Sequence, residues 1–263
     1  MGEVLVITSG KGGVGKTTTT ANLGVALALD GHSVVLVDAD IGLRNLDLAM
    51  GLENRIVFDL LDVVAGTCLM RQALIKDRRY PGLWLLPAAQ TRDKAAVTPV
   101  QMGLLMQKLK AEFEYVLVDC PAGIEQGFQN AVAGADRAVL VTVPEVTAMR
   151  DACRVKALLD ERLVPVAGMV LNRYRPKMAR RGDIMDVDDA NDLLDVALLG
   201  VVPEDEAVVR MGNAGEPLAG GKAPAGQAYR KIARRIAGGE TQEERRGFVG
   251  VVRSLFGARA AAQ

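Results

Sequence analysis

Seven short apolar runs, separated by longer helical stretches, limit the folds open to this chain. The runs are rich in β-branched residues and do not alternate between apolar and polar positions, as expected of strands that are covered on both faces. They lie at Val4–Thr8, Val34–Val37, Leu83–Leu86, Tyr115–Val118, Ala138–Val143, Val166–Leu171 and Leu198–Val202. Helical patterns occur between most of them, for example at Thr18–Leu29, Pro99–Glu112, Thr147–Leu159 and Asp188–Leu194. This alternation predicts an α/β fold in which a mostly parallel sheet carries helices on both faces.

The chain divides into one large body and a short appendage. Residues 1–236 contain no polar linker that would separate two cores, so we expect a single domain there. Residues 237–244 form a polar linker, and residues 245–263 form a distinct tail. Lys+Arg and Asp+Glu both total 32, which gives a formal net charge of zero. A nucleic-acid partner is therefore not expected, because nucleic-acid binding usually needs a basic excess, although a local basic patch stays possible.

The cysteines and the apolar runs predict a cytoplasmic protein. Cys68, Cys120 and Cys153 lie far apart and form no CxxC pair, so neither a disulfide framework nor a metal-site spacing is indicated. The apolar run at Val4–Ile7 is too short for the core of a signal peptide. We find no run that approaches the ~18 apolar residues of a membrane span. A peripheral contact with the cytoplasmic face of the membrane stays possible.

A glycine-rich segment follows the first predicted strand. Ser9–Thr18 reads SGKGGVGKTT and contains the pattern G-x-x-x-x-G-K-[ST] from Gly10 to Thr17. In such a P-loop the glycines let successive backbone N–H groups point at a phosphate, the last lysine reaches the β- and γ-phosphates, and the hydroxyl after it binds Mg²⁺. A helix predicted to begin near Lys16 adds the positive end of its dipole. The alternative is a glycine-rich turn without a ligand, which the strand–loop–helix setting disfavours. The predicted phosphate-binding residues are Gly10, Lys11, Gly12, Gly13, Val14, Gly15, Lys16, Thr17 and Thr18.

Three aspartates follow predicted strands at the edge where an open α/β sheet binds its ligands. Asp38 and Asp40 follow the second run, and Asp119 ends the run that begins at Tyr115. We predict that Asp119 and Asp38 support Mg²⁺ together with Thr17, and that Asp40 orients the attacking water. The alternative for each aspartate is a helix cap or a turn.

A second lysine in the loop, Lys11, points to a particular family. Two lysines so close together are unfavourable without an anion. The segment KGGVGKTT resembles the deviant Walker A motif of the ParA/MinD family of P-loop ATPases. In that family the early lysine crosses a dimer interface and touches the nucleotide of the partner subunit. The resemblance therefore implies an ATP-dependent homodimer in which Lys11 and Lys16 both take part in catalysis.

Further segments resemble the members of this family that place the bacterial division site. The segments are Asp40–Asp47, Gln72–Asp77, Leu86–Lys94, Pro121–Glu125, Pro144–Asp151 and Val202–Asp205. The resemblance implies that Asn172, Pro203, Glu204 and Asp205 contact the adenine and the ribose. It also implies that Arg44 and Asp151 face regulators similar to MinC and MinE. From the residues alone, Asn172 could equally be a turn residue and Asp151 a solvated charge.

The tail has the pattern of a membrane-binding helix. Phe248, Val249, Val251, Val252, Leu255 and Phe256 fall within an arc of about 160° on a helix, with Arg253 beside it. Such a basic, amphipathic segment binds anionic lipid, and we predict membrane contacts for Phe248, Val252, Arg253, Leu255 and Phe256. The alternatives are a helix docked on the body or a tail without a role. The resemblance agrees with the membrane, since these family members carry a membrane-targeting helix at this end.

Taken together, these patterns predict an Mg²⁺- and ATP-dependent dimerising ATPase that cycles on and off the cytoplasmic membrane and helps to place the division septum. The main alternative is a ParA-type ATPase that moves DNA. A metabolic or redox enzyme on the same fold would need a cysteine-ligated cluster, and the position of Cys120 directly after Asp119 does not match that pattern well.

Overall fold

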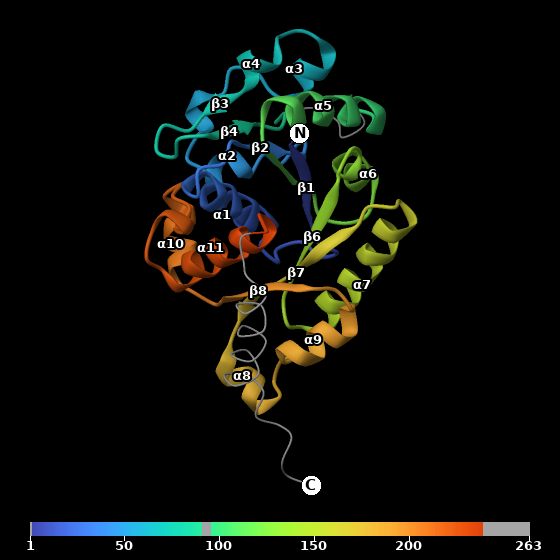
Figure 1. Ribbon diagram of the computed structural model, residues 1–263, viewed down its shortest axis with the longest axis vertical. Coiled ribbons are helices and arrows are strands. Elements are labelled where there is room, and N and C mark those ends of the chain that lie inside the picture. Colours follow the sequence, from blue (N-terminus) through green and yellow to red (C-terminus); the bar gives the residue numbers. More distant parts are fainter. Residues whose placement is uncertain (1, 91–95, 239–263) are drawn as a thin grey trace.

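The computed structural model of the chain describes residues 2–90 and 96–238 (Figure 1). Its strands are β1 (Glu3–Thr8), β2 (Val34–Asp38), β3 (Ile75–Lys76), β4 (Leu83–Leu86), β5 (Tyr115–Asp119), β6 (Arg137–Thr142), β7 (Val166–Tyr174) and β8 (Leu198–Pro203). Its α-helices are α1 (Lys16–Leu29), α2 (Leu46–Ala49), α3 (Leu60–Ala65), α4 (Met70–Ala73), α5 (Pro99–Glu112), α6 (Gln126–Val132), α7 (Val146–Glu161), α8 (Pro176–Arg181), α9 (Val187–Leu194), α10 (Ala207–Asn213) and α11 (Pro224–Ile236). Short 3₁₀ turns form η1 (Glu53–Arg55) and η3 (Leu218–Gly220).

In the described part of the chain, eight strands form one sheet in the order β3-β4-β2-β5-β1-β6-β7-β8. All neighbouring strands are parallel except β3 and β4, which pair antiparallel. The predicted α/β fold with a mostly parallel sheet is therefore confirmed. The sequence did not predict β3, because two residues are too short for an apolar run to stand out.

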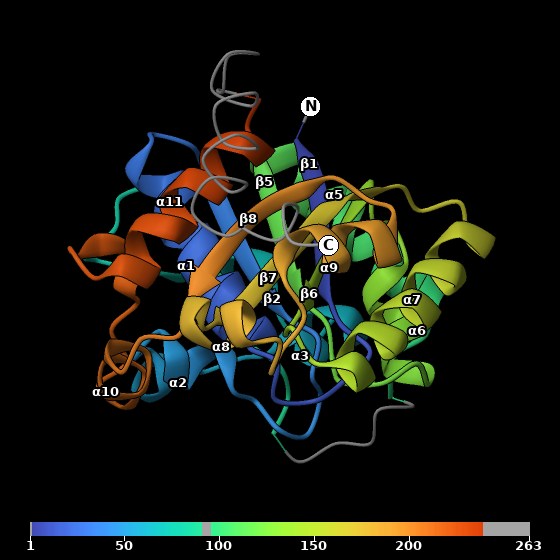
Figure 2. The ribbon, with the colours of Figure 1, turned by 90° about the horizontal axis from the view of Figure 1, so that it is seen from below.

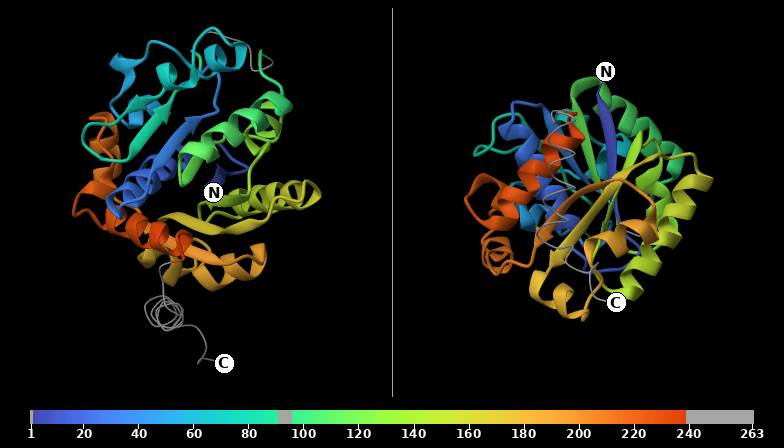
Figure 3. Two further views of the ribbon diagram at one scale, coloured as in Figure 1. Left: turned by 45° about the horizontal axis from the view of Figure 1, so that its top comes forward. Right: turned by 60° about the horizontal axis from the view of Figure 1, so that its bottom comes forward.

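Both faces of the sheet are buried, which explains why the strands show no alternation. Along β1, Val4 and Val6 point into one core, whereas Leu5 and Ile7 point into the other. Helices α5, α6, α7 and α9 cover the first face, and α1 and α11 cover the second. Figure 2 and Figure 3 show these two helical layers with the sheet between them.

The described part ends two residues after α11, which stops at Ile236. The predicted tail therefore lies outside the described residues, and with it Phe248, Val252, Arg253, Leu255 and Phe256. Among the helices of residues 2–90 and 96–238, we find none whose length and apolar character would let it span a bilayer.

Candidate functional site

The glycine-rich loop leaves the sheet at its centre. It connects the carboxyl end of β1 to the first turn of α1, and β1 lies between β5 and β6 (Figure 1). In a parallel sheet all strands end at the same edge, so the residues after β2, β5 and β6 are brought to this loop.

The loop backbone requires glycine at several positions. Gly13 and Gly15 have φ angles of 78° and 99°, in the left-handed region that other residues avoid. A Cβ atom on Gly10 would lie 2.3 Å from the carbonyl oxygen of Asp151 in α7. A Cβ atom on Gly15 would lie 2.3 Å from Nδ2 of Asn172 in β7. The loop thus packs closely against α7 at Gly10 and against β7 at Gly15, which leaves no room for a side chain at either position.

The two lysines of the loop have very different surroundings. Lys16 is 7% exposed, and its Nζ donates a hydrogen bond to Oγ of Ser9 at 2.9 Å. The Ser9 hydroxyl in turn donates to the Lys11 carbonyl at 2.8 Å, which ties the start of the loop to its end. The Lys11 side chain is 45% exposed and forms an ion pair with Glu145, with 3.2 Å between Nζ and Oε2. Lys16 therefore faces the inside of the site, while Lys11 lies on its rim.

Two of the predicted aspartates stand side by side. Asp38 at the end of β2 and Asp119 at the end of β5 are directly paired in the sheet, and both are almost fully buried. Burial, together with the neighbouring charge of Asp119, raises the pKa of Asp38 to about 8. Burial raises the pKa of Asp119 to about 6, although a hydrogen bond from Thr17 and the charge of Lys16 act in the other direction. A cation bound beside these two buried carboxyl groups would stabilise their ionised form.

The third aspartate lies close to this pair. The negative charge of Asp40 contributes to the raised pKa of both Asp38 and Asp119. Asp38 holds the segment that carries Asp40, because its carboxylate accepts hydrogen bonds from the N–H groups of Asp40 at 2.9 Å and Leu46 at 3.2 Å. The structure therefore brings all three predicted aspartates to the edge of the sheet where the loop lies.

The residues present fit a magnesium ion that is shared with a phosphate. Within residues 2–90 and 96–238, no group of three His, Cys, Asp or Glu side chains could hold a metal ion by itself. Mg²⁺ in phosphate sites is usually held by only one or two protein groups, with phosphate oxygens and water completing its shell. Thr17, Asp38 and Asp119 lie together and could provide such groups. Thr20, one turn further along α1, donates a hydrogen bond to Asp119 at 3.2 Å and fixes that carboxylate.

The residues predicted to contact the base occupy the neighbouring strands β7 and β8. Asn172 is buried, and its Nδ2 donates to the carbonyl of Val14 at 2.8 Å, so it touches the loop itself. Pro203 ends β8, and Glu204 forms an ion pair with Arg175 at 3.5 Å. The carboxylate of Asp205 accepts hydrogen bonds from the N–H groups of Ala207 and Ala225, at the starts of α10 and α11. Asp205 thus has a structural role that its sequence position did not indicate.

The two residues predicted to face regulators lie near the same edge. Arg44 forms an ion pair with Asp47 at 2.8 Å, and its side chain is only 20% exposed. Burial raises the pKa of Asp47, and the positive charge of Arg44 opposes this shift. Asp151 lies in α7 and pairs with Arg154 at 3.4 Å. Arg44 therefore compensates a buried charge, and the contact of both residues with regulators remains a prediction.

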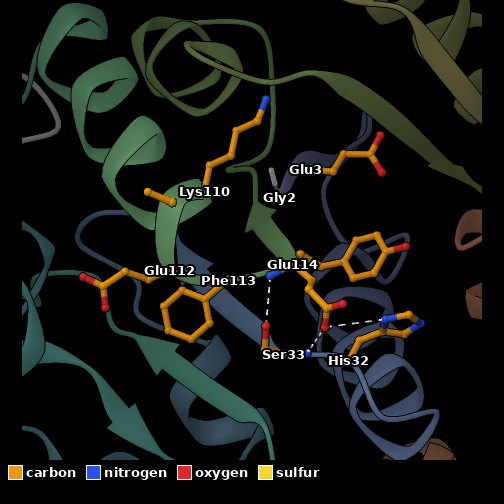
Figure 4. A pocket seen from close by; sticks show the side chains of 10 residues that line it. Gly2, Glu3, His32, Ser33, Lys110, Glu112, Phe113 and Glu114 are labelled. Carbon is orange, nitrogen blue, oxygen red and sulfur yellow. Dashed lines mark hydrogen bonds and ion pairs between the residues drawn. The ribbon is translucent and has the colours of Figure 1, made fainter.

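A separate cavity of about 620 Å³ lies at the opposite edge of the sheet, where the strands begin (Figure 4). Glu114 is held there by the N–H group of Ser33 at 2.7 Å and lies 3.7 Å from His32. Because the phosphate loop follows the carboxyl ends of the strands, this cavity is not part of the predicted site.

Comparison with known proteins places the chain in a family. The family described as CobQ/CobB/MinD/ParA nucleotide binding domain matches residues 5–218. The septum site-determining protein MinD of Bacillus subtilis is 54% identical over 268 residues, which cover 99% of this chain and all of the relative. The chain belongs to the MinD/ParA family. Among MinD proteins, that of Helicobacter pylori is 40% identical, covering 97% of this chain and 100% of the relative.

Solved MinD structures have the same fold. A MinC:MinD cell division complex from Aquifex aeolicus contains a chain with a TM-score of 0.85 and 46% identity, covering 91% of this chain and 97% of that one. MinD from Pyrococcus horikoshii, complexed with Mg-ADP, has a TM-score of 0.83 and 32% identity, covering 90% of this chain and 96% of that one. Membership of the MinD/ParA family supports nucleotide binding and hydrolysis by this chain.

Some contacts at this MinD/ParA-type site could not be read from the sequence. Ser9 accepts a hydrogen bond from Lys16, and Thr20 donates one to Asp119. A single hydroxyl residue beside a motif has no sequence pattern that would predict such a contact. The position of Glu145 near the site could have been predicted, because it follows the strand-forming run Ala138–Val143 and so lies at the ligand-binding edge of the sheet. The contact of Asn172 with Val14 joins residues 158 positions apart, and only the folded sheet reveals it.

Proposed function

We propose that this chain is an Mg²⁺-dependent ATPase that dimerises when it binds ATP, attaches to the cytoplasmic face of the membrane through its tail, and helps to place the division septum. Full-length similarity to septum site-determining proteins supports the cellular role. The MinC:MinD complex supports a regulator similar to MinC, and a regulator similar to MinE belongs to the same proposal.

The observation that carries the proposal is the contrast between the two lysines of the loop. Lys16 is buried and directed into its own site, whereas Lys11 is about half exposed at the rim and held by a surface ion pair. A lysine at the rim can release Glu145 and reach a phosphate on a second subunit, since an exposed ion pair is weak. ATP placed between two subunits would then hold the dimer together.

The arrangement suits phosphoryl transfer, which depends on positioning and on charge neutralisation. We assign Lys16 and the loop N–H groups to the β- and γ-phosphates, and Lys11 to the phosphates of the partner subunit. Thr17, Asp119 and Asp38 would hold Mg²⁺, which neutralises charge on the phosphates when it is bound. Asp40 would accept a hydrogen bond from the attacking water and orient it.

The tail provides the proposed switch between membrane and cytoplasm. One short amphipathic helix binds lipid only marginally, but a dimer presents two of them. Linking two binding sites raises the apparent affinity by ~10²–10⁴ when both can engage. ATP would therefore promote attachment by causing dimerisation, and hydrolysis would reverse it.

A vesicle co-sedimentation assay tests this proposal. The full chain is compared with a variant lacking residues 245–263, on vesicles that contain anionic lipid, with ATP or ADP. We expect the full chain to sediment with ATP, to stay mostly in solution with ADP, and to lose binding when the tail is removed. Equal sedimentation with both nucleotides would contradict the switch.

Two further measurements separate the proposal from its alternative. Light scattering should show the mass of a dimer with ATP and that of a monomer with ADP. DNA binding that depends on ATP and survives removal of the tail would instead favour a ParA-type role.

A further inference from the structure

We propose that Asn172 is a positioning residue for the phosphate loop, and that it has this role whether or not it also contacts a nucleotide base. The inference rests on the proposed binding of a nucleotide at this loop. Asn172 lies in β7 and reaches the loop from a strand that is two positions away from β1 in the sheet.

The contact between Asn172 and the loop is buried and closely fitted. Nδ2 of Asn172 donates to the carbonyl oxygen of Val14 at 2.8 Å, and the two residues are 6% and 3% exposed. The same nitrogen lies where a side chain on Gly15 would have to go, at 2.3 Å from a Cβ atom built there. The amide therefore packs against two consecutive residues of the loop.

This contact determines the direction of one loop peptide. The carbonyl of Val14 and the N–H of Gly15 belong to the same planar, trans peptide group, so they point in opposite directions. Because Asn172 holds the carbonyl toward β7, the N–H of Gly15 is directed away from β7. N–H groups that are fixed in this way form the anion-binding concavity of a P-loop. Without the donor, the buried carbonyl would lose its partner, and the peptide would be less restricted.

The positioning role can be separated from a contact with the base by the choice of ligand. A base contact affects only ligands that carry a base. A contact that orients the loop affects every ligand that binds through its phosphates, including inorganic tripolyphosphate. The decisive quantity is the loss of affinity for tripolyphosphate, which carries no base.

We suggest isothermal titration calorimetry with Mg-ATP and with magnesium tripolyphosphate on the full chain and on Asn172→Leu. Leucine has a similar shape but provides neither a donor nor a charge. We expect magnesium tripolyphosphate to bind about tenfold more weakly, and Mg-ATP to lose at least the same factor, because the orientation of the loop is lost for both ligands. Asn172→Ala should also weaken the binding of both ligands and serves as a second variant if leucine impairs folding.

Asn130→Leu is the matched control. Asn130 is also buried and donates through Nδ2 to a backbone carbonyl, that of Val97, at 3.0 Å. The Asn130→Leu variant should lower the thermal unfolding temperature about as much as Asn172→Leu does, without changing the affinity for either ligand. A loss for Mg-ATP alone would assign Asn172 to the base and overturn the inference, as would unchanged affinities. Failure of the unmodified chain to bind Mg-ATP would instead contradict the proposed function.

Discussion

At the scale of single residues, the site is defined by carboxylates in places that disfavour their charge. Asp38 and Asp119 meet because β2 and β5 are neighbours in register, and burial raises the pKa of both. Hydrogen bonds from the Thr20 hydroxyl to Asp119 and from the Asp40 N–H group to Asp38 hold the two carboxyl groups in place. A bound cation would offset the cost of ionising these two buried, neighbouring carboxyl groups, so the pair favours the binding of positive charge.

This pair predicts an unusual dependence of stability on pH. The pKa values of about 8 for Asp38 and about 6 for Asp119 lie above the value of 3.8 that applies to an unfolded aspartate. The folded chain therefore binds more protons than the unfolded chain between pH 4 and pH 8. Without ligand, the contribution of this pair to the free energy of unfolding should fall as the pH rises through that window. Urea unfolding at several pH values measures the slope, and Asp38→Asn should make it smaller.

The assignment of Asp40 predicts a separation between binding and turnover. Asp40→Ala should leave Mg-ATP affinity nearly unchanged, because the loop and Lys16 carry the binding. It should lower the rate of hydrolysis by about 100-fold or more, since the attacking water is no longer oriented. Phosphate release under saturating ATP measures the rate, and calorimetry measures the affinity. Undiminished turnover would require another residue for this role.

At the scale of elements, α1, which begins directly after the phosphate loop, packs against α11. The hydroxyls of Thr19 and Tyr229 lie 3.3 Å apart in the buried interface between the two helices. Asn22 of α1 donates to the carbonyl of Thr18 and accepts from the N–H of Ala219 in η3. Buried polar contacts of this kind fix the rotation of one helix against another more strictly than apolar packing does.

Removal of the hydroxyl contact between Thr19 and Tyr229 should weaken the packing of α1 against α11 without leaving a cavity in the core. Tyr229→Phe keeps the ring and is expected to lower the free energy of unfolding by about 1 kcal/mol. Thr19→Val should give a similar loss. In a double-mutant cycle the combined variant should cost less than the sum of the two single changes, because both remove the same contact. Additive losses would show that the two hydroxyls do not interact.

At the scale of the whole molecule, we expect the ion pair between Lys11 and Glu145 to compete with the proposed dimer. In the proposed dimer we expect Lys11 to leave its own Glu145 when it reaches the nucleotide of a partner subunit. Both side chains are about half exposed, so the pair contributes little, in the range of roughly 0–1 kcal/mol.

Weakening this pair should favour the dimer. In Glu145→Gln, we expect half-maximal dimerisation at an ATP concentration about two- to fivefold lower, as judged by light scattering over an ATP titration. Glu161→Gln is the control, since this exposed glutamate lies at the last residue of α7, whereas Glu145 occupies the N-cap position at the start of that helix. A requirement for more ATP in Glu145→Gln would indicate that Glu145 supports the dimer.

The sequence alone determined the fold class and the phosphate loop. Strands buried on both faces must be apolar throughout, and a P-loop must place glycines, a lysine and a hydroxyl at fixed spacing, so both are local properties of the chain. The common edge at Asp38, Asp40 and Asp119 was also predictable, because parallel strands all end on the same side of their sheet.

Only the tertiary structure decided how these parts act on one another. The register of β2 against β5 places Asp38 beside Asp119 and creates their raised pKa values. The pairing of Lys11 with Glu145 and of Asn172 with Val14 joins residues more than 130 positions apart. Burial and distance between remote segments are products of folding, and the order of residues in a sequence does not contain them as local patterns.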